Sequence, residues 1–139
     1  MLRQASHSLS IRASRPGLHE FTSAVEQWLR STKIEEGLLT LFCRHTSASL
    51  IIQENAAPAA RRDLERYFAR VAPEDGPYEH VDEGPDDMPA HIRAALTQTQ
   101  LTIPVQAGRL ALGTWQGIFL FEHRDATPER QIVLHLVGE

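Results

Sequence analysis

The segment from Ile118 to Phe121 constrains the fold more than any other part of the chain, because four consecutive residues are apolar. Successive side chains of a strand point to opposite faces, so an uninterrupted apolar run predicts a strand that is covered on both sides. Such a strand needs a packed layer above it and another below it. The segment therefore predicts a layered fold around a buried strand.

Apolar periodicity places helices and strands along the rest of the chain. Alternating or continuous apolar residues predict strands at residues 7–12, 38–45, 50–52, 101–105, 110–112, 114–122 and 132–137. Helical spacing predicts helices at residues 21–29, 55–73 and 86–96. Asn55 is the expected N-cap of the second helix, and Asp86 or Asp87 that of the third. We therefore predict an α+β fold with sheets and packed helices.

Length and composition fit one domain, which we predict to span residues 1–139. A chain of 139 residues that is 42% hydrophobic can bury one core. Its net charge of −4 argues against nucleic acid and anionic membrane as partners, and leaves small charged metabolites open. The single cysteine cannot form an internal disulfide, and no apolar run approaches the roughly 20 residues that cross a bilayer. Because no signal peptide is recognisable, we expect a cytoplasmic protein.

His45 ends an otherwise apolar row on the strand predicted at residues 38–45. Counting back by two places Cys43, Leu41 and Leu39 on the same face. Desolvation at such a position favours the neutral imidazole, which binds metals or accepts protons. The alternative is a core histidine that hydrogen-bonds a backbone carbonyl. For Cys43, a buried small side chain is favoured over a nucleophile.

Two further histidines are candidates for the same site. His80 lies in a long acidic loop with several Pro and Gly residues, where it is either a solvated polar residue or a ligand or general acid–base. His91 lies in the first turn of the third predicted helix, where the helix dipole opposes a charged imidazolium. It is either a packing residue or a metal ligand. If His45, His80 and His91 converge, they resemble a catalytic rather than a closed structural zinc site.

Glu122 and the segment Gly113–Gln116 complete the candidates. Glu122 follows the apolar strand, where a carboxylate pairs with Arg124 or Arg130, binds metal or accepts a proton, the ion pair being favoured. Gly113–Gln116 offers an indole and an amide that suit a planar heterocycle, although Trp115 at a strand start is more often a core residue.

Taken together, several segments resemble the YjbQ-like family over nearly the whole chain. They are His45–Leu50 (HTSASL), Glu54–Asn55, Asp63–Leu64, Tyr78 with His80, Pro89–Ile92 and Leu112–Gln116 (LGTWQ). The resemblance implies a compact α+β sandwich of sheets and a homotrimer with sites close to subunit boundaries. It also implies a secondary thiamine-phosphate synthase, which joins an aminomethylpyrimidine diphosphate to a thiazole phosphate and releases pyrophosphate.

The resemblance also implies roles for individual residues. It points to His45, His80 and His91 as the imidazoles of the pocket, with Glu122 near them. The residues themselves suggest that these imidazoles would hold a divalent metal, zinc or magnesium, and that His80 and Glu122 are the candidate catalytic residues. Asn55, Trp115 and Gln116 are expected near them. The hydroxyls of Thr46 and Ser47, with Arg130, are expected to hold phosphate. Two departures from the family pattern are Ala57, where an acid is common, and the turn at residues 125–130.

Two other functions fit the same residues. In one, the metal activates water for hydrolysis of a small phosphorylated metabolite, with Glu122 as the base. In the other, a trimer binds a metabolite or a metal and catalyses no reaction. Whether the protein is an enzyme is therefore left open by the sequence.

Overall fold

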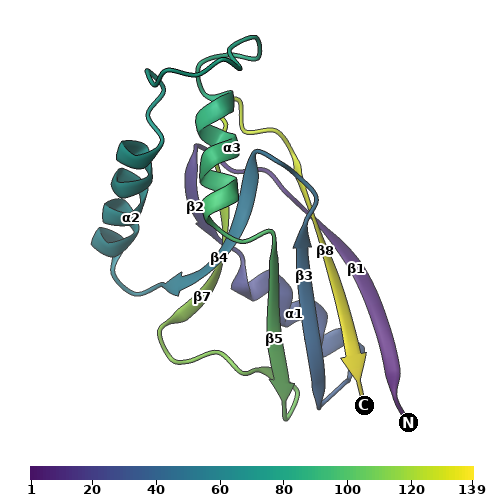
Figure 1. Cartoon of the computed structure of the whole chain (residues 1–139). Coiled ribbons are helices and arrows are strands. Elements are labelled where there is room, and N and C mark those ends of the chain that lie inside the picture. Colours follow the sequence, from purple (N-terminus) through teal and green to yellow (C-terminus); the bar gives the residue numbers. More distant parts are fainter.

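The computed structural model describes all residues 1–139 and contains two antiparallel sheets (Figure 1). The larger sheet has the strand order β1 (Arg3–Ile11), β8 (Arg130–Gly138), β3 (Gly37–Cys43), β5 (Gln100–Gln106) and β6 (Arg109–Leu110). The smaller sheet has the order β2 (Gly17–Glu20), β7 (Gln116–Glu122) and β4 (Ala48–Glu54). The helices are α1 (Thr22–Thr32), α2 (Pro58–Val71) and α3 (Asp87–Leu96). The predicted single-domain α+β fold with three helices is confirmed, and every strand pairing is antiparallel.

The main core lies between the two sheets, and β7 is its buried strand. Ile118 and Leu120 point into this core, together with Leu39 and Leu41 of β3. The alternate residue Phe119 belongs to a second apolar cluster, on the other face of the smaller sheet. Both faces of β7 are therefore covered, as the continuous apolar run predicts.

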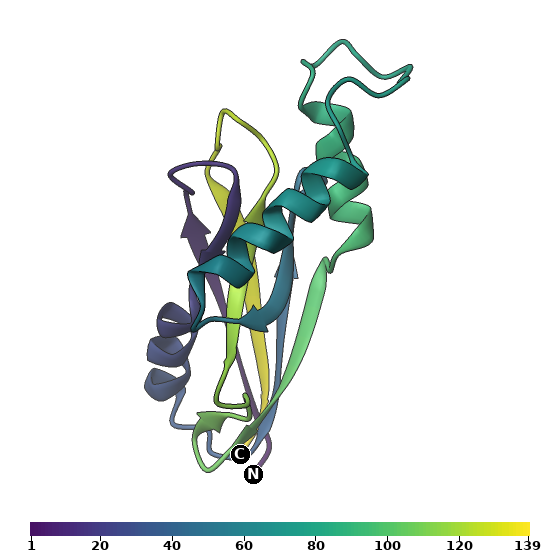
Figure 2. The ribbon, with the colours of Figure 1, turned by 90° about the vertical axis from the view of Figure 1, so that its left-hand side faces the viewer.

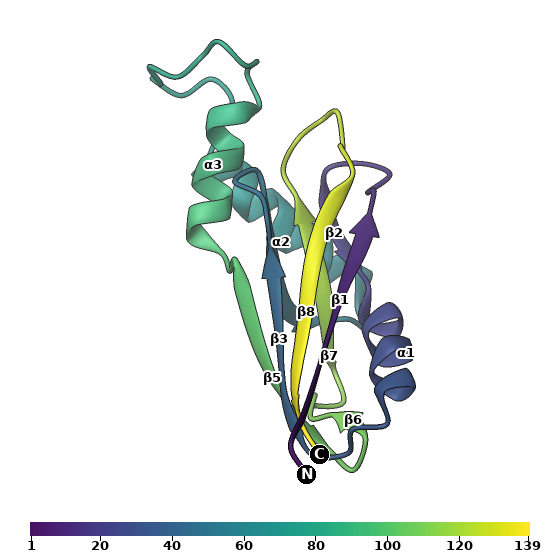
Figure 3. The ribbon, with the colours of Figure 1, turned by 90° about the vertical axis from the view of Figure 1, so that its right-hand side faces the viewer.

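The helices cover the smaller sheet and leave one face of the larger sheet bare. α1 contributes Val25 and Leu29 to the main core. α2 places Leu64 and Phe68 against the second cluster and lies across the smaller sheet (Figure 2). Figure 3 shows β5, β3, β8 and β1 side by side with no helix in front of them. None of the three helices is both long and apolar enough to cross a membrane.

Three local predictions differ from the structure. The third strand ends at Cys43, so His45 lies in the turn before β4 and not on the strand. The sequence predicts no strand between residues 12 and 21, but the short strand β2 begins at Gly17, where the chain turns with a φ of 123°. Asn55 does not cap α2, since Ala57 occupies the N-cap and the Asn55 side chain bonds Glu20 instead.

Several segments that matter for function meet at one end of the molecule. The long loop between α2 and α3 extends from this end, where α3 also begins (Figures 1 and 3). The turn between β3 and β4 and the turn between β7 and β8 lie beneath it. Both chain termini lie at the opposite end.

Candidate functional site

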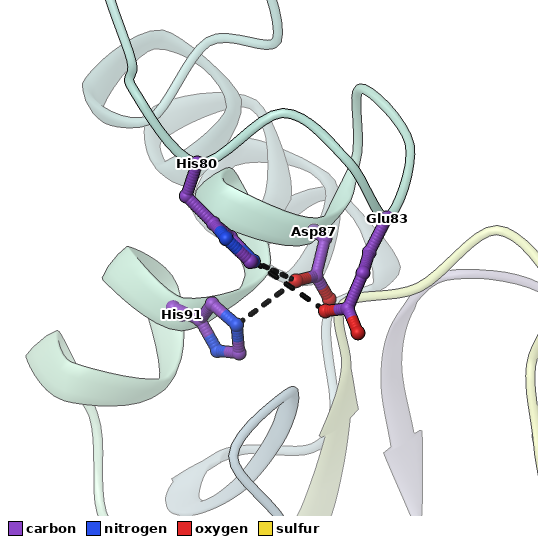
Figure 4. A group of neighbouring side chains, drawn as sticks. All are labelled: His80, Glu83, Asp87 and His91. Atoms are coloured by element: carbon purple, nitrogen blue, oxygen red, sulfur yellow. Dashed lines mark hydrogen bonds and ion pairs between the residues drawn. The ribbon is translucent and has the colours of Figure 1, made fainter.

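Four side chains from the long loop and the start of α3 converge at this end (Figure 4). Nitrogen and oxygen atoms of His80, Glu83, Asp87 and His91 all lie within 4.8 Å of one another. Oδ2 of Asp87 lies 2.7 Å from Nε2 of His80 and 3.0 Å from Nε2 of His91. Two imidazole nitrogens and two carboxylate oxygens are a ligand set typical of a first-row transition metal or zinc. We call these four residues the His/acid cluster.

Local geometry explains how the cluster forms. Asp87 and His91 are four residues apart on α3, so their side chains share one face of the helix. The loop then returns His80 and Glu83 to that face, with His80 Nε2 3.4 Å from Glu83 Oε2. Asp87 is buried, whereas the two histidines and Glu83 are accessible. The cluster therefore has a fixed carboxylate at its base and an open side.

The hydrogen bond of His91 defines which of its nitrogens faces the cluster. Nδ1 lies 3.0 Å from the carbonyl oxygen of Thr46. A carbonyl only accepts hydrogen bonds, so Nδ1 carries the proton and Nε2 of the neutral ring presents a lone pair to Asp87. Two acceptors only 3.0 Å apart require a proton or a metal cation between them. A backbone carbonyl that orients an imidazole in this way is the usual outer partner of a metal ligand.

Arg124, from the turn between β7 and β8, fixes the acidic side of the cluster. Its guanidinium bonds Asp87, the carbonyl of Glu83 and, through Nε at 3.0 Å, Oδ2 of Asp86. Asp86 occupies the predicted N-cap of α3 but makes no cap bond, because it binds Arg124 and the backbone N–H of Asp125. The predicted capping role is therefore replaced by a bridge between α3 and this turn.

The charges shift the pKa values within the cluster. Burial alone would raise the pKa of Asp87, but the hydrogen bond from His80 and the nearby cation Arg124 lower it below its ordinary value. That same hydrogen bond raises the pKa of His80. Asp87 is therefore ionised and ready to hold a cation at neutral pH.

A cleft of about 850 Å³ opens beside the cluster and shares His91 with it. Its lining is Phe42, Cys43, Arg44, His45, Thr46, Ser47, His91, Ala94, Ala95, Thr99 and Arg130. This set contains two arginines and two histidines but no aspartate or glutamate, in a chain with 18 acidic residues. The cleft is therefore suited to an anionic ligand, although the whole chain is acidic.

His45 lies in this cleft but not in the His/acid cluster. Its Nε2 accepts a hydrogen bond of 2.8 Å from the backbone N–H of Gln131. The structure thus brings His80 and His91 together, and places His45 on the neighbouring wall with one nitrogen already used. Cys43 is buried, and burial raises the pKa of its thiol to about 11, as expected of a packing residue.

Glu122 and Arg130 form a buried ion pair. Nε of Arg130 lies 2.8 Å from Oε1 of Glu122, and a terminal nitrogen lies 2.5 Å from Oε2. Oε2 also accepts the backbone N–H groups of His123 and Arg124. Both carboxylate oxygens are engaged, so Glu122 has the surroundings of a structural anion, and the salt bridge favoured by the sequence is present.

Asn55, Trp115 and Gln116 lie far from the cluster. The register pairs Glu54 with Gln116 at one end of β4 and β7, and Ala48 with Glu122 at the other. Seven residues of strand separate these ends by roughly 20 Å. Trp115 is 63% exposed, and Gln116 bonds the backbone N–H of Gly113. Within one chain these residues do not meet the metal-ligand candidates.

The sequence does not predict Glu83 or Asp87 as candidate metal ligands, nor Arg124 as their partner. The i,i+4 spacing of Asp87 and His91 is a signal that could have revealed Asp87 as a neighbour of His91. No local pattern links Arg124 to them, because the turn between β7 and β8 meets α3 only in the folded chain.

Comparison with known proteins supports the family that the sequence segments suggest. The model of the family described as UPF0047 protein YjbQ-like matches residues 7–139. A UPF0047 protein of Synechocystis is 51% identical and covers 99% of this chain and 94% of its own. YjbQ of Escherichia coli O157:H7 is 44% identical over 95% of this chain and 96% of its own.

Solved structures are similar as well. A YbjQ-like protein of unknown function from Sulfolobus solfataricus covers all of both chains with a TM-score of 0.90 at 24% identity, which supports the fold alone. A conserved protein of the yjbq/upf0047 family from Clostridium acetobutylicum has a TM-score of 0.84 at 32% identity, covering 92% of this chain and 97% of its own. The chain therefore belongs to the YjbQ-like UPF0047 family.

Proposed function

We propose that the protein is a divalent-metal-dependent transferase for small phosphorylated metabolites. The observation that carries the proposal is the acid-free cleft, which shares His91 with the His/acid cluster. A phosphorylated ligand would find cationic and hydroxyl donors in the cleft and a cation-binding group at its border. The charge of the whole chain does not oppose such a ligand, because the acidic residues lie outside the cleft lining.

His80, Glu83, Asp87 and His91 are the residues that would hold the metal. Mixed nitrogen and oxygen ligands favour zinc or a first-row transition metal over magnesium, which prefers oxygen ligands and water. When bound, the ion would supply positive charge for phosphate oxygens that gain charge as a leaving group departs. Arg124 would keep Asp87 oriented in both the empty and the loaded site.

A transfer reaction fits the cleft better than hydrolysis by a carboxylate base. The cleft lining contains no Asp or Glu, and Glu122 is engaged with Arg130. Coupling of an aminomethylpyrimidine diphosphate to a thiazole phosphate needs no such base. The bond from carbon to the diphosphate oxygen breaks with its electron pair on pyrophosphate, and the thiazole nitrogen forms the new bond to that carbon. Positioning and charge neutralisation dominate this reaction.

Metal binding gives the first test. We expect about one equivalent of zinc per purified chain, and loss of more than half of it in the His91→Ala and Glu83→Gln variants. Asp75→Asn, an exposed acid of the same loop outside the cluster, is the matched control and keeps its metal. Elemental analysis with calorimetric zinc titration measures both. Zinc binding that is the same in all four proteins would contradict the proposed cluster.

Product formation gives the second test. We expect thiamine phosphate to appear by chromatography when the zinc-loaded protein is incubated with both phosphorylated precursors, and to be lost with His91→Ala. Release of inorganic phosphate without coupling would replace the transferase proposal by a hydrolase. Metal and ligand binding with no turnover of either kind would support the binding-protein alternative.

Assembly into a homotrimer belongs to the same proposal. Trp115, Asn55 and Gln116 would approach the cluster only if another copy supplied them, because strand length separates them within one chain. The bare face of the larger sheet supports self-association, since none of the outward residues of β1, β8, β3 and β5 is Lys, Arg, Asp or Glu. These residues are Gln4, Ser6, Ser8, Ser10, Leu38, Thr40, Phe42, Gln100, Thr102, Pro104, Gln106, Gln131, Val133, His135 and Val137.

Light scattering after gel filtration tests the assembly. We expect a mass three times that of the 15.6 kDa chain, and dissociation of the Phe42→Asp variant. Val71→Asp is the control, because Val71 is as exposed as Phe42 but lies on α2, away from this face. A monomeric wild type would contradict the assembly.

A further inference from the structure

We propose that His45 is an oxyanion-binding residue of the cleft, held as the neutral tautomer that donates from Nδ1, and that it is not a metal ligand. The inference rests on the proposed function, in which the cleft holds a phosphorylated metabolite. It identifies His45 as a hydrogen-bond donor to the phosphate. This role is distinct from that of the four residues of the His/acid cluster. The ligand class is a phosphate or diphosphate oxygen.

The hydrogen bond to Gln131 fixes the tautomer. A backbone N–H only donates, so Nε2 of His45, 2.8 Å from the nitrogen of Gln131, accepts with its lone pair. The proton of a neutral imidazole is then on Nδ1. Nε2 cannot bind a metal without breaking this bond. The geometry therefore removes His45 from the ligands that the sequence suggests and makes it a donor.

Nδ1 has no hydrogen-bond partner in the chain, and it is not among the buried polar atoms that lack one. His45 is half-buried on the wall of the cleft. A fixed N–H at such a place is a preorganised donor, which binds an oxyanion without reorientation. Burial, and secondarily the charge of Arg130, lower the pKa of His45, so the ring stays neutral at physiological pH.

The neighbours of His45 provide further donors for the same anion. The side chains of Arg44, Thr46 and Ser47 line the cleft, and none makes a hydrogen bond or ion pair within the chain. Four consecutive residues of the turn between β3 and β4 thus have side-chain donors without a partner in the chain, and all four line the same cleft. The carbonyl of Thr46 meanwhile receives the N–H of His91, so the turn also borders the cluster. A phosphate at His45 would therefore lie next to the metal ligands without sharing His45 with them.

Two isosteric variants separate the two nitrogens of His45. In His45→Gln the side-chain oxygen can replace Nε2 as acceptor for Gln131, but the Nδ1 donor is lost. In His45→Asn the amide nitrogen can replace the Nδ1 donor, but the acceptor is lost. Calorimetric titration of the zinc-loaded proteins with inorganic pyrophosphate measures how much the Nδ1 donor contributes to anion affinity. Thermal unfolding measures how much the Nε2 acceptor contributes to stability, and elemental analysis measures the zinc content.

We expect His45→Gln to weaken pyrophosphate binding about 10- to 100-fold, the usual effect of losing one hydrogen bond to a charged group, at nearly unchanged melting temperature. His45→Asn should bind within about threefold of the wild type but melt earlier, because a backbone N–H loses its partner. Both should retain zinc. Nitrogen NMR of His45 should show the proton on Nδ1.

The results distinguish this inference from the proposed function. Wild-type pyrophosphate binding that His45→Gln weakens, without turnover, would sustain the role of His45 and reject the transferase. Turnover by the wild type, with pyrophosphate binding unaltered in His45→Gln, would support the transferase and reject the role of His45. Loss of zinc from both variants, equal loss of binding in both, no binding by the wild type, or a proton on Nε2 would each overturn the inference.

Discussion

Replacing Arg130 by methionine is expected to lower the free energy of unfolding by about 3–5 kcal/mol. Only 3% of Arg130 and 1% of Glu122 are exposed, and the pair is joined through both carboxylate oxygens. Without the guanidinium, the Glu122 carboxylate would remain buried with only two backbone N–H groups for partners. Denaturant titration of wild type and variant measures the difference.

Two controls separate a buried charge from simple loss of an ion pair. The double variant Arg130→Met, Glu122→Gln should recover much of the loss, because no unpaired charge remains inside. Arg66→Met removes an exposed pair with Asp63, 3.7 Å apart, and should change stability by less than about 1 kcal/mol. If Arg130→Met were no more harmful than Arg66→Met, the ion pair would not be a structural element of the fold.

The fold is well predicted by the sequence, because periodicity reports burial directly. The apolar run of β7 predicts a strand buried on both faces. The strict alternation of β5 predicts a strand buried on one face, and its buried residues are Leu101, Ile103 and Val105. The short strand β2 is not predicted, since its four residues are ordered by pairing with β7, about 100 residues later in the chain. Local pattern carries no information on such a distant partner.

The site is only partly predicted, for a related reason. The sequence groups His45, His80 and His91, whereas only His80 and His91 lie together in the structure. The strand predicted to reach His45 ends at Cys43. The chain turns there, and Nε2 of His45 accepts a hydrogen bond from the backbone N–H of Gln131 in β8. Asp87 was interpreted as a cap, although its carboxylate serves two histidines and Arg124. Residues of one chemical type have several possible partners, and only the tertiary structure selects among them.

Acidification is expected to destabilise the protein through His123, a buried histidine outside the proposed mechanism. Its side chain is 1% exposed, Nε2 lies 2.9 Å from Oγ of Ser49, and Nδ1 has no partner. Burial, with the nearby cations Arg93 and Arg130, lowers the pKa of His123 to about 3. The unfolded chain titrates near 6.5, so it binds the proton first. Stability from this residue is therefore complete above pH 6.5 and is lost as the pH falls.

At pH 5 the loss from His123 is about 2 kcal/mol, since each unit of pKa shift corresponds to about 1.4 kcal/mol. His123→Gln cannot titrate, so the variant should lose less stability than the wild type between pH 7.5 and pH 5. Denaturant midpoints at both values, with m-values, measure this difference. His45, whose pKa is also lowered, remains in both proteins and cancels in the comparison. Identical pH dependence of the two proteins would mean that the His123 site admits a charged ring, which burial and the charges of Arg93 and Arg130 oppose.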